Sequence, residues 1–152
     1  MGTGVTISCK NCDYSDGFSV GIGMLYGSLR ILLDFSLKGS LNHIKRKELI
    51  DLLDNHNADE NNCGDTNFGH EILRCDKCNN LVERFHVKML YDGDKVYETI
   101  YKCPKCKNKL DVFNDYSLDF DTSESLDLPI PCPKCGENEL FFDTYAGIVC
   151  WD

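Results

Sequence analysis

The sequence predicts a small α+β protein, built from two metal-stabilised β units with a helical insertion. Ten cysteines occur in 152 residues, and eight of them form four Cys-x-x-Cys pairs. Between the second and third pairs, apolar residues alternate before an Asp-Gly sequence and β-prone residues follow it, which predicts a β-hairpin. Between the first and second pairs, apolar residues at helical spacing predict two helices, over about residues 24–37 and 41–55.

The N-terminal region is expected to form a strand, a Cys-x-x-Cys turn and a second strand over residues 2–20. Each such turn is called a knuckle below. The helix at 24–37 is apolar on nearly every side and should therefore be buried, and Gly39 follows it as a stop signal. Ser40 is expected to cap the helix at 41–55, whose basic residues at 45–47 we interpret as a solvated face.

The central hairpin is expected to have arms at residues 81–91 and 95–102, joined by Asp92, Gly93 and Asp94. If the arms pair antiparallel, the knuckles that flank them reach the same open end. A strand at 110–113, an acidic excursion at 114–127, and two short strands at 140–145 and 148–151 complete the chain.

The cysteine spacing predicts structural metal sites. Zn²⁺ in a structural site takes four ligands in tetrahedral geometry, so four pairs make two closed sites. The predicted ligands are Cys9, Cys12, Cys75, Cys78, Cys103, Cys106, Cys132 and Cys135, and the predicted cofactor is two structural Zn²⁺ ions. Cys63 and Cys150 stand alone and are expected to be a loop thiol and a strand-packing residue.

Two pairings of the knuckles deserve comparison. In the nested pairing, 75/78 shares a metal with 103/106, and 9/12 shares one with 132/135. In the sequential pairing, 9/12 joins 75/78, and 103/106 joins 132/135. The hairpin favours the nested pairing, and its longer loop adds little entropic cost because that cost grows only with the logarithm of length. We then expect one compact unit over residues 1–152, with a central zinc ribbon at 74–107, a second ribbon formed by 1–22 with 128–152, and a helical insertion and loop at 23–73.

Catalytic motifs are not found, and no catalytic residue is predicted. The knuckles lack the strand-to-helix setting of a thioredoxin-like redox pair. The histidines form no HExxH pair: His43 and His56 are expected on a helix surface or end, and His86 is expected to point outward from the hairpin. His70, near Cys75, remains an alternative ligand.

The net charge, the apolar runs and the start of the sequence narrow the expected partners and location. The formal net charge is −9, which disfavours a nucleic-acid phosphate backbone and suits solubility or basic partners. No apolar run has the length of a membrane span, and the start of the chain shows no export signal, so we expect a cytoplasmic protein with reduced thiols.

Several motifs together resemble a family of uncharacterised bacterial zinc-ribbon proteins. They are MGTGVTISCKNCDYSDGFSVGIGM at the start, KGSL near residue 40, CDKCNNL, YKCPKCKNKL, CPKCGENEL and the terminal Trp151-Asp152. The resemblance spans most of the chain and implies paired Cys₄ metal sites in a small cytoplasmic bacterial protein. It implies no activity. Our leading hypothesis is a zinc-binding protein-interaction module, and the alternatives are a nucleic-acid-binding zinc ribbon, through the lysines at 102–109 and the basic residues at 45–47, and a thiol-redox or hydrolytic enzyme.

Overall fold

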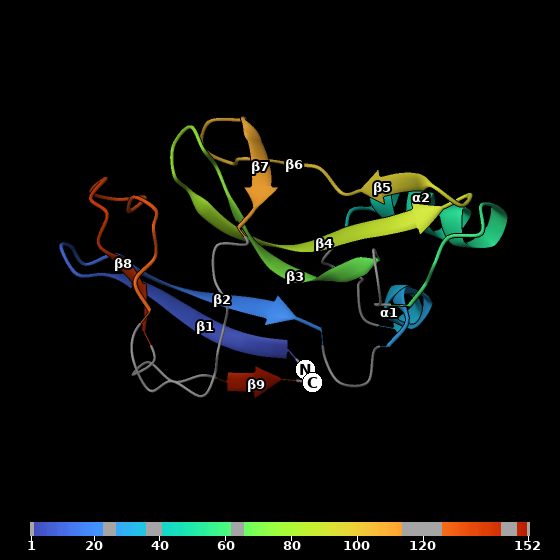
Figure 1. Cartoon of the computed structure of the whole chain (residues 1–152), viewed down its shortest axis with the longest axis horizontal. Coiled ribbons are helices and arrows are strands. Elements are labelled where there is room, and N and C mark those ends of the chain that lie inside the picture. Colours follow the sequence, from blue (N-terminus) through green and yellow to red (C-terminus); the bar gives the residue numbers. More distant parts are fainter. Residues whose placement is uncertain are drawn as a thin grey trace.

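The architecture is a large antiparallel sheet with two helices at one end (Figure 1). The computed structural model describes residues 2–22, 27–35, 41–61, 66–113, 126–143 and 149–151. Within these residues, the strands are β1 (Gly2–Cys9), β2 (Ser15–Gly21), β3 (Asn67–Arg74), β4 (Leu81–Tyr91), β5 (Lys95–Glu98), β6 (Tyr101–Lys102), β7 (Lys109–Val112), β8 (Leu140–Phe142) and β9 (Val149–Trp151). The helices are α1 (Leu29–Phe35) and α2 (His43–Asn55).

The sheet runs in the order β5-β4-β3-β2-β1-β8, and every pairing in it is antiparallel. β9 also pairs with β1, β7 pairs with β3, and β6 pairs with β7. The predicted strand–knuckle–strand at the N-terminus is present as β1 and β2. β8 lies against residues 7–9 of β1, and β9 lies against residues 2–4, so the C-terminal part of the chain lines one edge of the N-terminal strand.

The central hairpin forms at Asp92–Asp94 as predicted, but its ladder is shorter than expected. β4 and β5 pair only from Lys88 with Glu98 to Tyr91 with Lys95. Thr99 still donates its backbone N–H to the Val87 carbonyl at 2.9 Å, and β6 then turns away to pair with β7. The second arm at 95–102 is therefore two strands, because residues 101–102 find their partner on the far side of the third knuckle.

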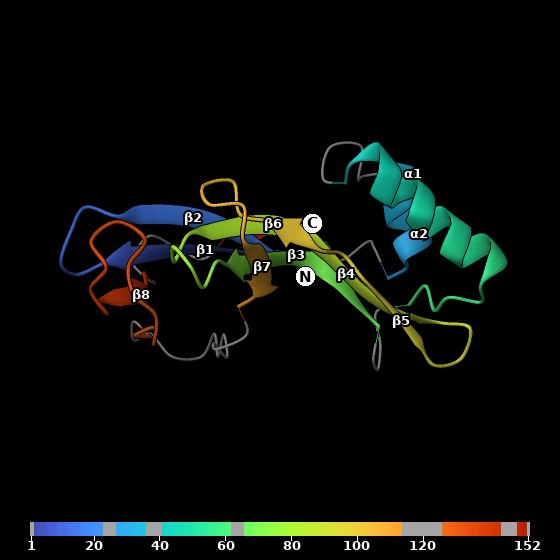
Figure 2. The ribbon, with the colours of Figure 1, turned by 90° about the horizontal axis from the view of Figure 1, so that it is seen from above.

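Both helices pack on one side of β4 and β5 (Figure 2). Their leucines form a core with Phe68, Phe85, Val87 and Met89. α1 is shorter at its start than predicted, since residues 27 and 28 are not helical; residues 23–26 and 36–40, with the proposed Ser40 cap, lie outside the described residues. Asn42 caps α2 instead, because its side chain accepts a hydrogen bond from the Lys45 N–H at 2.9 Å.

A second core joins the two ends of the chain to the central strands. It contains Val5, Ile7 and Leu140 from the terminal strands, together with Ile72 and Phe113 from the central region. A third, smaller core surrounds Leu73, Leu110 and two of the cysteines. The chain thus has the predicted mixture of helix and sheet, with the sheet dominant. No described helix is long and apolar enough to cross a membrane. The division of the chain at residues 23, 74 and 107 stays a prediction, and residues 114–125 lie outside the described part.

Candidate metal centres

Eight cysteine side chains gather in two groups of four. One group is Cys75, Cys78, Cys103 and Cys106, and the other is Cys9, Cys12, Cys132 and Cys135. In each group all sulfurs lie within 4.8 Å of one another. We call the first group the central cluster and the second the terminal cluster. This grouping is the nested arrangement, in which the terminal cluster encloses the central cluster in sequence.

The central cluster is built from two hairpin turns. The knuckle at 75–78 connects β3 to β4, and the knuckle at 103–106 connects β6 to β7. β7 pairs with β3 at Leu73 with Val112 and at Arg74 with Asp111, and this pairing sets the two turns side by side. The hairpin between β4 and β5 therefore helps to deliver the cysteines, but the β3–β7 pairing fixes their contact.

The terminal cluster joins the two ends of the chain. The knuckle at 9–12 connects β1 to β2, and the knuckle at 132–135 precedes β8. β8 pairs with β1 next to Cys9, and Lys10 donates its backbone N–H to the Glu139 carbonyl at 2.9 Å. Lys134 and Asp13 form an ion pair across the two knuckles.

Three knuckles share a detailed backbone geometry. In each, the first cysteine accepts a hydrogen bond at its carbonyl from the N–H four residues on and donates its own N–H to the carbonyl five residues on, at 2.8–3.0 Å. The residue after the second cysteine has a left-handed φ: 55° at Asn79, 62° at Lys107 and 81° at Gly136. The first knuckle shares the Cys9 N–H bond to Tyr14, but Asp13 is not among the described residues with positive φ.

The sulfur spacing fits a tetrahedral metal. A Zn–S bond of about 2.3 Å gives a tetrahedron with an S···S edge of about 3.8 Å. The observed Sγ···Sγ distances include 3.7 Å for Cys9–Cys135 and for Cys12–Cys132, 3.6 Å for Cys78–Cys103 and 3.3 Å for Cys75–Cys106. A disulfide bond of about 2.05 Å is far shorter, and all eight cysteines are free. The two groups can therefore hold metal ions.

Backbone N–H groups favour the thiolate form at some of these sulfurs. Burial opposes ionisation of Cys103, but the N–H groups of Cys106 and Lys105 and the neighbouring thiols donate to its sulfur, and its pKa falls to about 6. The N–H of Glu137 is the largest cause that lowers the pKa of Cys135 to about 7.

Other sulfurs of the same clusters shift in the opposite direction. The N–H of Tyr14 favours the Cys12 thiolate, yet burial and three neighbouring sulfurs outweigh it and raise the pKa of Cys12 to about 12. Within each cluster, some sulfurs thus favour the thiolate form, and other sulfurs keep their protons. A divalent cation that bound the four sulfurs would replace those protons.

Neither cluster includes a histidine among the residues that the structure describes. His70 Nδ1 contacts Glu83 Oε1 at 2.9 Å, and His70 is in neither group of ligands. His56 follows α2 and contacts Asp92, as expected for a helix end. The side chain of His43 lies outside the described residues.

His86 differs from its prediction. It is 6% exposed, and its Nε2 lies 3.1 Å from Glu98 Oε1. Burial lowers the pKa of His86, and Glu98 opposes that shift. The alternation along β4 was predicted correctly, but this second face of the strand is partly covered by the turn into β6 and β7 rather than open to water.

Comparison of the chain with family models, with curated proteins and with solved structures gave no match. The paired cysteine clusters are like those of zinc ribbons in their metal-binding geometry. The resemblance to a bacterial family stays an expectation. Cys63 lies outside the described residues, and Cys150 lies in β9 with its side chain undescribed.

Proposed function

We propose that this chain is a zinc-binding protein in which two structural Zn²⁺ ions hold a scaffold for binding another protein. The observation that carries the metal assignment is the gathering of two sets of four cysteine sulfurs at tetrahedral spacing. All-sulfur coordination suits Zn²⁺, and four protein ligands leave no open position for substrate. Each ion would neutralise thiolate charge and cross-link segments far apart in the sequence.

A cytoplasmic location and a bacterial source belong to the same proposal. Free thiols at metal-binding spacing require a compartment that keeps cysteine reduced, and the motifs resemble a bacterial family. The interaction role is supported by exposed apolar side chains on a metal-closed scaffold. Val96, Ile100 and Ile44 are 52%, 62% and 67% exposed, and exposed apolar side chains can enter the apolar centre of a protein interface.

Metal analysis of paired serine variants tests the metal sites. Cys9→Ser with Cys132→Ser removes ligands from one cluster, so this variant should retain one Zn²⁺ per chain. Cys9→Ser with Cys75→Ser damages both clusters and should retain none. Under the sequential pairing, Cys9→Ser with Cys75→Ser would instead retain one Zn²⁺, because both cysteines would belong to the same site. Cys63→Ser is the matched control and should keep both ions. Native protein that folds without metal would overturn the proposal.

The interaction role needs its own test. Crosslinking of the zinc-loaded chain in cells, followed by mass spectrometry, should identify a defined protein partner whose crosslinks disappear in a variant that lacks one zinc. Recovery of nucleic acid in place of a protein would contradict the interaction role and leave the metal sites intact.

A further inference from the structure

The two clusters differ in how far the protein covers their sulfurs. Both contain a knuckle with the same sequence, Cys-Pro-Lys-Cys, at residues 103–106 and 132–135. The second cysteine of this knuckle is half-buried in the central cluster, at Cys106, but exposed in the terminal cluster, at Cys135. Because the local sequence is identical, the difference comes from what the rest of the chain packs around each knuckle.

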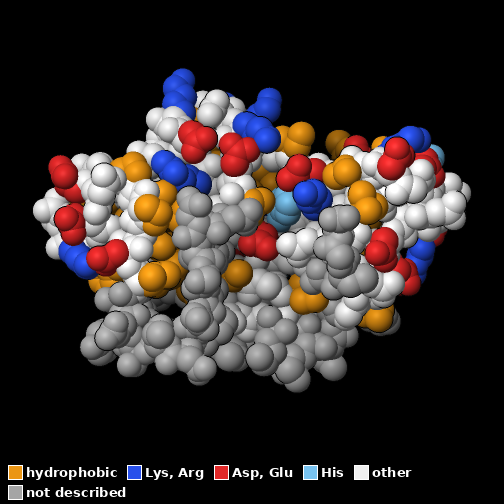
Figure 3. All heavy atoms as spheres, in the orientation of Figure 1, with side chains coloured by type: hydrophobic (Ala, Val, Ile, Leu, Met, Phe, Trp, Pro, Cys, Tyr) orange, Lys and Arg blue, Asp and Glu red, His pale blue; other side chains and the backbone are white. Residues whose placement is uncertain are grey.

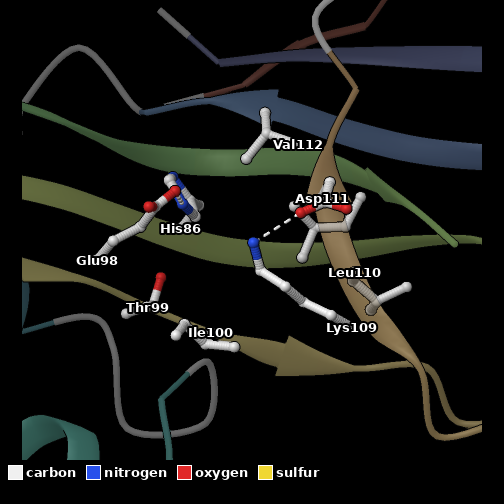
Figure 4. Close-up of a pocket in the computed structure, with 9 residues that line it drawn as sticks. His86, Glu98, Thr99, Ile100, Lys109, Leu110, Asp111 and Val112 are labelled. Atoms are coloured by element: carbon white, nitrogen blue, oxygen red, sulfur yellow. Dashed lines mark hydrogen bonds and ion pairs between the residues drawn. The ribbon is translucent and has the colours of Figure 1, made fainter. Parts of the chain in front are cut away.

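The central cluster is enclosed by a small core of its own. All four of its cysteines belong to the core around Leu73 of β3 and Leu110 of β7 or pack directly against it. Figure 4 shows β7 crossing over β3 and β4, with Leu110 and Val112 on it and with the ion pair of 2.8 Å between Lys109 and Asp111 on the same strand. None of the four cysteines is exposed, so an oxidant in solution has no open path to their sulfurs.

The terminal cluster is covered less completely. Three of its cysteines belong to the core that joins the chain ends or pack against it, whereas Cys135 is not part of that core. Outside the knuckles, Lys134 and Asp13 form an ion pair, and Figure 3 shows charged side chains of both signs at this end of the molecule, on the left. Cys135 is thus accessible from water, with three further sulfurs within 4.8 Å of its own.

A second sulfur lies within reach of Cys135. The Sγ atoms of Cys9 and Cys135 are 3.7 Å apart, although the two residues are separated by 126 positions in the sequence. The pairing of β8 with β1, which includes Cys9 opposite Leu140, holds the two knuckles in place. A disulfide bond is about 2.05 Å long, so the two sulfurs need to approach by about 1.7 Å. Rotation of the exposed Cys135 side chain can supply much of that movement.

We propose that the terminal cluster is a redox-sensitive zinc site, in which a peroxide oxidises Cys135 and Cys9 to a disulfide and releases one Zn²⁺. The central cluster keeps its ion under the same conditions and maintains the rest of the sheet. The proposal rests on the zinc-binding function proposed above and adds a regulatory role for one of the two sites. Its consequence for the fold is a change in how residues 126–143 are held against β1.

The reaction balances with the peroxide as the only oxidant. The Cys135 thiolate attacks one peroxide oxygen, an S–O bond forms, the O–O bond breaks and hydroxide leaves, so Cys135 becomes a sulfenic acid. The Cys9 thiolate then attacks the Cys135 sulfur, the S–S bond forms, the S–O bond breaks and a second hydroxide leaves. Two protons from solvent convert both hydroxides into water. Each sulfur gives up one electron and each peroxide oxygen gains one. The Zn²⁺ loses two of its four ligands and is released to solvent.

The test adds hydrogen peroxide to the zinc-loaded full chain and follows zinc release with a chromogenic indicator, with the same indicator but no peroxide as the background. The chain should hold two ions before oxidation, which checks the function on which the proposal rests. Peroxide should release the first ion about tenfold faster than the second, because only the terminal cluster has an exposed thiolate. A dithiol reductant with added Zn²⁺ should restore the lost ion.

Mass spectrometry after alkylation of the free thiols locates the oxidised residues. After release of the first ion, it should find a disulfide between Cys9 and Cys135. All four cysteines of the central cluster should still be alkylated as free thiols. This disulfide map uses the wild-type chain and therefore does not depend on whether any variant folds.

Cys135→His and Cys106→His form a matched pair of variants. Each replaces the second cysteine of a Cys-Pro-Lys-Cys knuckle by a residue that also binds Zn²⁺ but forms no sulfenic acid. Cys135→His should retain two ions and slow the peroxide-driven release of the first about tenfold. Cys106→His should leave the rate of the first release unchanged, and zinc analysis verifies the loading of both variants.

Several results would overturn the proposal. Release of both ions at one rate would show that exposure of Cys135 does not set the order. A disulfide between Cys132 and Cys135, or oxidation of Cys135 without any disulfide, would exclude the step at Cys9. Unchanged release from Cys135→His with two ions bound would show that another sulfur reacts first. Two ions that peroxide does not release would overturn the redox role alone, whereas a chain without zinc before oxidation would overturn the zinc-binding function itself.

Discussion

The residue that follows each knuckle sets the direction in which the chain leaves the cysteine pair. Gly136 has φ +81°, and a Cβ built there meets no atom within 4 Å. Gly136→Ala should therefore cost about 1 kcal/mol of unfolding free energy through backbone strain alone, without a steric clash. Chemical denaturation of the zinc-loaded protein measures this cost.

Gly17→Ala is the control for that measurement. A Cβ at Gly17 also meets no atom within 4 Å, but its φ lies outside the left-handed region. Its unfolding free energy should stay equal to that of the wild type or rise slightly, because the unfolded chain loses freedom. Equal destabilisation of the two variants would show that the left-handed turn is not what Gly136 provides.

These turns mark what the sequence can and cannot predict at single positions. Gly136 after a Cys-Pro-Lys-Cys sequence is typical of a knuckle turn, and the structure agrees. Asn79 and Lys107 have the same left-handed conformation. Nothing about a lysine favours that φ, so only the hydrogen bonds of the folded knuckle reveal it. His86 escaped prediction for a related reason, since its cover comes from residues distant in sequence.

At the scale of elements, local sequence signals predicted the hairpins and the helices. The remaining strand contacts depend on pairing between residues distant in sequence. Asp92 and Gly93, with φ values of 48° and 92°, form the expected turn between β4 and β5. The exchange of partners at residues 99–101 has no local signal, because β6 is two residues long and exists only by pairing with β7. The contact between β3 and β7 that brings two knuckles together was likewise not predicted.

The junction of β2 with β3 is the narrowest link in the sheet. Among the described residues, only Gly21 and His70 pair across it, and a Cβ on Gly69 would lie 3.2 Å from the Gly21 carbonyl carbon and oxygen. Gly21 also pairs with Gly2, so its backbone cannot easily move aside. Gly69→Ala should therefore destabilise the protein by about 1–3 kcal/mol.

Thermal and chemical unfolding of the zinc-loaded Gly69→Ala variant measures this effect. Gly27→Ala is its control, because a Cβ at Gly27 has open space around it. Stability unchanged by Gly69→Ala would mean that β2 and β3 can separate slightly without loss.

At the scale of the whole molecule, the nested clusters make the two ends of the chain depend on one another. The cysteine spacing predicted two groups, and the hairpin favoured the nested arrangement that the structure displays. Spacing alone left the sequential pairing open. What closes the choice is the antiparallel contact of β8 with β1, which sets Cys9 next to the knuckle at 132–135.

The terminal cluster should lose its metal first. Each cluster has two buried cysteines, and the clusters differ at Cys135, which is exposed, whereas Cys78 and Cys106 of the central cluster are half-buried. A chelator reaches an exposed sulfur before a buried one, so zinc release followed with a chromogenic chelator should show a fast and a slow phase. Cys9→Ser with Cys132→Ser should abolish the fast phase, and Cys75→Ser with Cys103→Ser should abolish the slow one.

Loss of the first ion should also loosen one specific part of the fold. Among the described residues, the ladder between β8 and β1 covers only residues 7–9 of β1, so without metal residues 126–143 depend mainly on buried side chains such as Leu128 and Ile130. Limited proteolysis after the fast phase should cut within those residues while β3 and β4, whose ladder spans eight residue pairs, stay intact. Cleavage that begins in β3 or β4 would show that the central cluster is the weaker of the two, and that burial of its sulfurs does not protect its metal.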